Sequence, residues 1–132
     1  MTTTTRLTAL GVLTGLLLTT LTVLAPTANA AWTTWGNRHG AKPQVCKVVL
    51  SGGSVRVKVR VDARRATHAH RVTIFRDRNG SYREIEVRAA AGRISATSSI
   101  VLARGDQAGL TVHEPNGGAG GDMLQLGRIS RC

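Results

Sequence analysis

Two histidines separated by a single residue are the first candidates for chemistry in this chain of 132 residues. On a strand, the side chains of His68 and His70 would project to the same face, because successive residues alternate between faces. Imidazole suits zinc, copper and nickel, so the pair could supply two ligands of a metal site. No third ligand follows at a fixed spacing, although folding could bring His39 or His113 near. We therefore expect a surface or half-buried pair and no metal or cofactor, with His68 and His70 as the ligand candidates of the alternative.

Two carboxylates with the same spacing, Glu84 and Glu86, would also share a strand face. Glycoside hydrolases use such pairs, but they also need a deep sugar cleft and one carboxyl whose pKa is raised by burial. In a small basic chain we expect these glutamates to pair with arginines on the neighbouring strand instead. The sequence also lacks the G-x-S-x-G motif of serine hydrolases. We therefore predict that the protein is not an enzyme.

A glycine-rich segment offers a candidate calcium loop. Residues 117–125 fit the calcium nonapeptide pattern G-G-x-G-x-D-x-U-x at every fixed position. That architecture binds calcium between successive turns of a parallel β-roll, and the pattern is not repeated on either side of the segment. We expect Pro115 to Asp122 to be a flexible hairpin loop, with calcium binding at Gly117 to Asp122 as the alternative.

The first thirty residues have the three-part pattern of a secretory signal peptide. Arg6 supplies a short positive region, residues 7–24 are apolar, and the Ala-Asn-Ala motif at residues 28–30 is a cleavage site. A retained membrane anchor is the alternative, because the apolar run approaches the length that spans a bilayer. The cleavage motif directly after the run favours removal. We therefore expect residues 1–30 to be cleaved and the rest to be secreted as a single domain of roughly a hundred residues.

The only two cysteines, Cys46 and Cys132, allow one intramolecular disulfide. Neither has a second cysteine or a histidine at the spacing of a metal site, and disulfides persist in an export context. Closing a loop of this length would stabilise the fold by about 4–5 kcal/mol in the chain-entropy model. We predict a structural disulfide between these two residues.

The exported part of the chain is strongly basic. Only one of the 18 basic residues and none of the 7 acidic residues precedes residue 31, so the exported part keeps almost all of the formal charge of +11. Arg56, Lys58 and Arg60 alternate with valines and predict an exposed cationic stripe on one strand, with Arg64 and Arg65 following it. These five are our candidate anion-binding residues. The alternative is that the cations protect a strand from aggregation and keep the protein soluble.

The strand pattern is clearest from Val45 to Val61, where two alternating runs flank the segment Ser51 to Ser54 and predict a β-hairpin. The Asn79-Gly80 pair predicts a second hairpin. Further strands are expected within residues 71–75, 82–87, 94–102, 110–112 and 123–132. About seven short strands and no amphipathic helix predict an all-β fold, an antiparallel immunoglobulin-like β-sandwich with one disulfide over residues 44–132.

Residues 31–43 show no strand or helix period and predict an extended N-terminal segment. This segment holds both tryptophans, Trp32 and Trp35. They could form an exposed platform for a sugar ring or pack against the sheet, and we favour packing because the chain has few other aromatic residues.

The order of a signal peptide, a cysteine near the first strand, a valine hairpin, an Asn-Gly hairpin and a terminal cysteine resembles the small exported immunoglobulin-like proteins of high-GC Gram-positive bacteria. The resemblance covers about Gln44 to Cys132 and rests on layout, without a diagnostic motif. Many members of that group have no assigned activity. The resemblance therefore implies the sandwich fold and little about function.

We predict a secreted, non-enzymatic β-sandwich that associates electrostatically with anionic wall polymers or membrane headgroups. Intracellular nucleic acid is excluded as a partner by export, and the aromatic side chains that stack on single strands are scarce. The alternative is a secreted inhibitor or toxin-like effector that contacts another secreted or surface protein through an exposed loop, such as Arg104 to Gly109 or Pro115 to Asp122. The salt dependence of binding distinguishes the two hypotheses, because only the affinity of charge-driven binding falls steeply with ionic strength.

Overall fold

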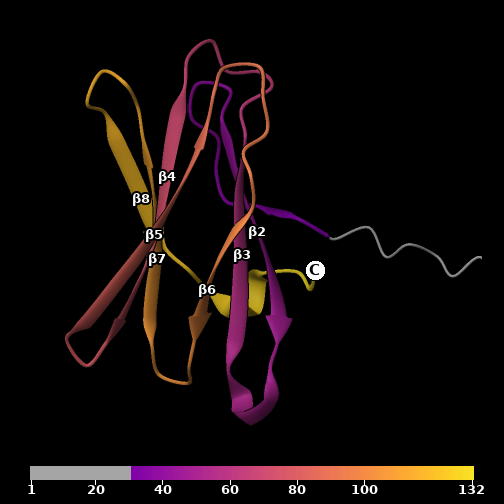
Figure 1. Ribbon diagram of the computed structural model, residues 1–132, viewed down its shortest axis with the longest axis vertical. Helices are drawn as coiled ribbons and strands as arrows, with labels where there is room; N and C mark the ends of the chain where they lie inside the picture. The colour runs from indigo at the N-terminus through magenta and orange to yellow at the C-terminus, as the bar shows by residue number, and fades with distance from the viewer. Residues whose placement is uncertain (1–30) are drawn as a thin grey trace, which may run out of the picture.

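The computed structural model describes residues 31–132, so the expected signal peptide lies outside the described residues. Two four-stranded antiparallel sheets, in the orders β1-β2-β3-β6 and β5-β4-β7-β8, form two layers (Figure 1). The elements are β1 (Thr33–Thr34), β2 (Lys42–Val49), η1 (Ser51–Gly53), β3 (Val55–Asp62), β4 (His70–Arg78), β5 (Ser81–Ala89), β6 (Ser98–Leu102), β7 (Gln107–His113), β8 (Ala119–Met123) and η2 (Leu126–Arg128). None of the helical segments among these residues is long or apolar enough to cross a membrane.

The predicted valine hairpin is present as β2, η1 and β3. Val57, Val59 and Val61 are fully buried on the inner face of β3, and the intervening basic residues lie on the outer face. Strands from both sheets contribute to a single core of small aliphatic side chains, in which Ile74, Leu102 and Leu110 are the largest fully buried residues. The alternation that is visible in the sequence thus separates the core from the surface.

The Asn-Gly turn also occurs where it is predicted. Asn79 and Gly80 have φ angles of 49° and 83° and join β4 to β5. The next predicted strand, residues 94–102, is too long, because only Ser98 to Leu102 pair as β6 and Ile94 forms an isolated bridge with Asp62.

The sequence of residues 31–43 predicts an extended N-terminal segment without regular structure. The structure corrects this prediction. The segment contains β1, and β2 already begins at Lys42. Between them Arg38 and Ala41 exchange two backbone hydrogen bonds of 2.8 and 2.9 Å across a two-residue turn. In that turn His39 and Gly40 have φ angles of 45° and 83°. A Cβ atom on Gly40 would collide with the backbone carbonyl of Arg65, so the turn packs closely against the connection between β3 and β4.

The predictions of a glycine-rich loop and of a final strand are also wrong in detail. β8 forms inside the expected loop and pairs with β7, with Gly121 opposite Thr111 and Gly120 opposite Val112. Two of its five residues are glycines and none is buried, so the strand leaves no alternation of apolar and polar side chains in the sequence. Beyond Met123 the chain forms η2 rather than a long strand.

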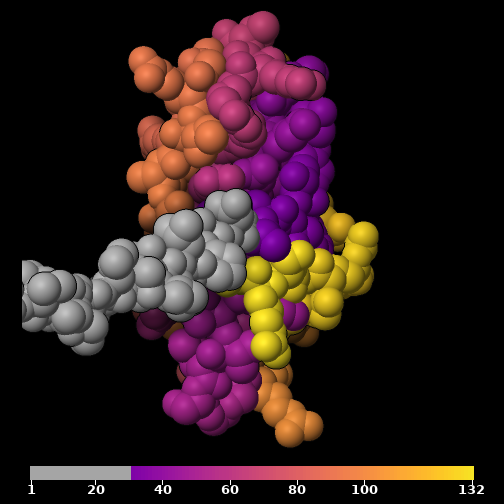
Figure 2. Space-filling view, turned by 90° about the vertical axis from the view of Figure 1, so that its right-hand side faces the viewer, coloured from indigo at the N-terminus to yellow at the C-terminus, as the bar shows by residue number. Residues whose placement is uncertain are grey.

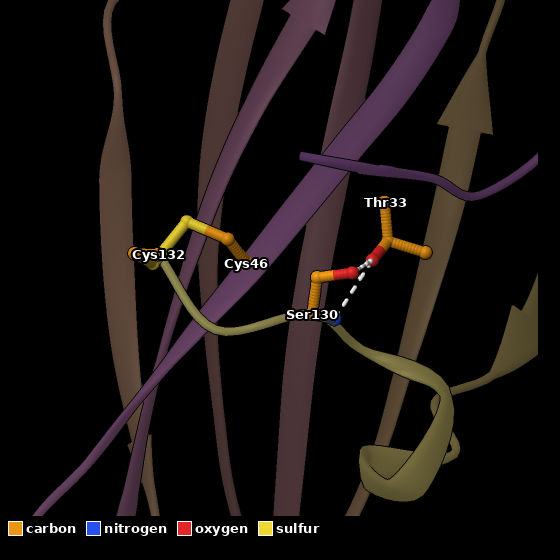
Figure 3. The surroundings of a disulfide bond; sticks show 4 residues. All are labelled: Thr33, Cys46, Ser130 and Cys132. Atoms are coloured by element: carbon orange, nitrogen blue, oxygen red, sulfur yellow. Dashed lines mark hydrogen bonds between the residues drawn. A yellow bond between two sulfur atoms is a disulfide. The ribbon is translucent and has the colours of Figure 1, made fainter. Parts of the chain in front are cut away.

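The predicted disulfide between Cys46 and Cys132 is confirmed, with the two Cα atoms 5.0 Å apart. It attaches the C-terminal segment to the edge of β2, where Lys47 N donates to Ser130 O at 2.9 Å. The Thr33 hydroxyl accepts a hydrogen bond from Ser130 N at 2.8 Å (Figure 3). β1 and the C-terminal segment therefore share the edge of β2, and Figure 2 shows this segment in yellow against the indigo first strands.

Candidate functional site

The outer face of the β1-β2-β3-β6 sheet is built around β3. Register places Arg56, Lys58 and Arg60 beside Val48, Cys46 and Gln44 of β2, and beside Val101 and Ser99 of β6. Strand alternation adds Lys42 to the same face. We call Lys42, Arg56, Lys58 and Arg60 the basic face.

Arg60 is held in place by two neighbours. Its Nε donates to Gln44 Oε1 at 2.8 Å, and its guanidinium lies 4.1 Å above the ring of Trp32. Trp32 is therefore covered on one side by a cation, and Trp35 packs against the hydrophobic core. Both tryptophans are half-buried, and the expected packing is confirmed for Trp35.

Asp62 is the carboxylate that adjoins this stripe, because it follows Arg60 by two residues on β3, and it is bound by Arg64. The ion pairs among residues 31–132 are Arg38–Glu114, His39–Glu114, Arg64–Asp62, Arg71–Glu86, Arg88–Glu86 and Arg78–Asp106. None of the three β3 cations Arg56, Lys58 and Arg60 takes part in them. These three side chains therefore form no ion pair within the described residues, although the charge of Asp62 acts on Arg60 at longer range.

Arg64 and Arg65, the other two candidate anion-binding residues, differ from each other. Arg64 donates to both oxygens of Asp62, at 2.9 and 2.7 Å, and this hydrogen bonding lowers the pKa of Asp62 to about 2. Arg64 is thus already engaged. Arg65 is exposed and, with Lys42, lines a hollow of about 270 Å³ near the end of the basic face.

Glu84 and Glu86 lie on the outer face of the other sheet. Glu86 pairs with Arg71 of β4 at 3.1 Å, as predicted, and also with Arg88 of its own strand. Glu84 instead accepts a hydrogen bond from the Tyr82 hydroxyl at 2.8 Å. Both residues are exposed on the outer face of β5.

The structure keeps the two predicted histidines together, but as a stacked pair rather than as two ligands on one strand face. His70 is buried, 2% exposed, and its ring stacks on that of His68 with centroids 4.7 Å apart. His70 Nδ1 lies 3.1 Å from the carbonyl oxygen of His68, so it supports the backbone there. The ligand atoms that gather within 4.8 Å of one another belong instead to His39, His68 and Glu114, the only such group among residues 31–132. Asp122 of the candidate calcium loop lies in β8 and is not in this group.

Glu114 has its carboxylate almost fully buried, with 3% of the side chain exposed. Arg38 Nε donates to its Oε1 at 2.8 Å, and His39 Nδ1 lies 2.9 Å from the same oxygen. These hydrogen bonds, the one from Arg38 first, hold the pKa of Glu114 below its ordinary value. The Glu114 carboxylate is therefore an anion at neutral pH.

Sequence reasoning found His68 and named His39 as a residue that folding could bring near, but it missed Glu114. The His39-Gly40 pair is a detectable signal, because a residue followed by glycine suits a two-residue hairpin turn. Glu114 carries no such signal, since it lies 75 residues from His39 and only follows a strand. Comparisons with protein-family models, curated proteins and solved structures find no match for this chain.

Proposed function

We propose that this protein is a secreted, non-enzymatic β-sandwich of immunoglobulin-like type that binds anionic cell-wall polymers through its basic face. The strand order supports the immunoglobulin-like part of the proposal. Strands β2, β3 and β6 correspond to A, B and E of such a sandwich, and β4, β7 and β8 to C, F and G, with β5 extending the second sheet.

The observation that carries the proposed binding is the row formed by Arg56, Lys58 and Arg60. Residues two apart on a strand are about 7 Å apart, so the row presents regularly spaced cations. Because none of the three forms an ion pair within residues 31–132, they are available to an external polyanion.

The test is retention of the purified, disulfide-bonded protein on isolated cell walls over a range of salt concentrations. Each cation near an anionic surface contributes about 1 kcal/mol, so the triple variant R56Q/K58Q/R60Q should bind about 100-fold more weakly at low salt. Wild-type affinity should fall log-linearly with ionic strength. Vesicles that contain anionic lipid form a parallel arm, and tighter binding to them than to walls would point to headgroups rather than wall polymers.

The matched control variant removes three positive charges from positions outside the basic face. Arg83, Arg93 and Arg104 are exposed, lie off the basic face and form no ion pair among residues 31–132. The variant R83Q/R93Q/R104Q should therefore retain most of the binding. Equal losses in both triple variants would show that net charge, not this face, drives binding, and the absence of retention at low salt would reject the proposal.

One loop favours the alternative of an effector that contacts another protein. Asp106 accepts hydrogen bonds from Arg78 at 2.7 and 2.9 Å and from the backbone N–H of Ala103 at 2.8 Å. These bonds hold the turn between β6 and β7 in shape and leave Arg104 exposed at its tip. Binding to a protein that persists at high salt would support this second candidate function.

A further inference from the structure

Three connections that are distant in sequence meet at one end of the sandwich. They are the turn before β2, the connection between β3 and β4, and the start of the connection between β7 and β8; the first two lie together at the top of Figure 1. They carry His39, His68 and Glu114, whose ligand atoms lie within 4.8 Å of one another. We propose that these three residues bind a divalent transition-metal ion, with zinc as the representative.

The donor set selects the class of ion. Two imidazoles and one carboxylate are ligands that zinc, copper and nickel accept, whereas calcium and magnesium take oxygen ligands. Zinc bonds of about 2.0–2.2 Å place tetrahedral donors about 3.4 Å apart, so the three groups need to move on the order of 1 Å to close on an ion. Three protein ligands leave a fourth position for water or another ligand.

Each ligand is held by its surroundings. Glu114 Oε1 accepts a hydrogen bond from Arg38, while Oε2 has no hydrogen bond among residues 31–132. His39 is fixed at a φ of 45°, a conformation that is uncommon for residues other than glycine, by the turn that packs against Arg65. Its side chain is 65% exposed, so an ion can reach the site from solvent.

His68 is oriented from two sides. The Thr67 hydroxyl lies 3.1 Å from His68 Nδ1, which leaves Nε2 for a metal. The buried ring of His70 stacks beneath it and bonds to its carbonyl oxygen. The arrangement resembles the way in which outer partners orient metal-ligating histidines, and it assigns His70 a positioning role.

The proposal is tested by isothermal titration of the purified, disulfide-bonded protein with zinc chloride, together with its thermal unfolding with and without zinc. One ion should bind per chain and raise the melting temperature. The variants are H39N, H68Q and E114Q. Asparagine tolerates a positive φ, so H39N removes the imidazole and keeps the turn. Each variant should weaken binding by more than about tenfold, the loss that even a supporting residue can cause.

The matched control is H113Q. His113 is adjacent to Glu114 in sequence, but it lies outside the cluster and its Nε2 contacts Thr73 Oγ1 at 3.2 Å. This variant should bind zinc as the wild type does. Cobalt should give the visible d–d absorption of a site with low coordination number, and H39N should lose it. Failure to bind one zinc ion, or unchanged affinity in H39N, would overturn the assignment, as would binding that depends on His68 and His70 but not on Glu114.

Discussion

At the scale of single residues, two aspartates anchor arginines at the ends of strands. Asp106 has 2% of its side chain exposed and accepts two hydrogen bonds from Arg78. Asp62 does the same with Arg64. In both cases hydrogen bonding to the arginine is the main reason why the pKa of the carboxyl is lowered from 3.8 to about 2.

These lowered pKa values predict a loss of stability in acid. The unfolded chain takes up protons near pH 4, whereas the folded carboxyls resist protonation until about pH 2. Their contribution to the free energy of unfolding is therefore complete above pH 4 and is lost as the pH falls toward 2. Urea unfolding at a series of pH values measures this change in the free energy of unfolding.

The variant D106A should lower the free energy of unfolding by about 1–3 kcal/mol at pH 7, because it removes hydrogen bonds to a charged group. Its difference from the wild type should shrink as the pH falls from 4 toward 2. D122A removes a carboxylate that has no ion pair among the described residues, so it should change the stability little. A difference that stays constant down to pH 2 would contradict this account.

At the scale of elements, the fold depends on connections that touch one another. The turn at His39 and Gly40 presses against the backbone at Arg65, and this contact places His39 beside His68. Gly40 permits this close approach because it has no side chain, and the neighbouring Ala63 and Ala66 are buried in the core.

The substitutions G40A and G52A test this contact. Both glycines have a positive φ, 83° and 71°, so both variants incur the strain of about 1–2 kcal/mol that a side chain suffers there. Of the two, the new Cβ atom meets backbone atoms at Gly40, whereas no atom lies within 4 Å of the new Cβ atom at Gly52. Chemical denaturation should therefore show a clearly larger loss for G40A. Equal losses would mean that the connection between β3 and β4 moves aside freely.

At the scale of the whole molecule, the disulfide joins β2 to the end of the chain across a separation of 86 residues. The tethered segment completes the edge of β2 that β1 leaves uncovered. The crosslink therefore holds together parts of the molecule that only a few other bonds connect, such as that between Thr33 and Ser130.

Loss of the disulfide should lower the free energy of unfolding by about 2–5 kcal/mol, because the unfolded chain regains the freedom of a long loop. Guanidinium unfolding of the double variant C46A/C132A, compared with the oxidised wild type, measures this difference. Reduced wild type keeps both sulfur atoms and serves as the control for lost packing. A loss below about 1 kcal/mol in the reduced protein would show that the remaining edge contacts suffice.

The sequence alone determined the features that arise from local periodicity and from counting. Alternating valines predicted the β2–β3 hairpin, Asn79-Gly80 predicted the β4–β5 turn, and two cysteines left one possible disulfide. The hairpin and the turn depend on residues that are close together in the chain, and two cysteines allow only one intramolecular pairing. For this reason the all-β architecture and the position of Arg56, Lys58 and Arg60 on one face could be predicted.

Only the tertiary structure decided the pairing of β8, the sharing of the β2 edge and the gathering of Glu114 with His39 and His68. Backbone pairing through glycines leaves no side-chain period to detect. The three polar ligands come from connections whose meeting depends on how the two sheets stack, and no local pattern records that. The sequence therefore predicted the central hairpins, and the packing of the sheet ends created the cluster.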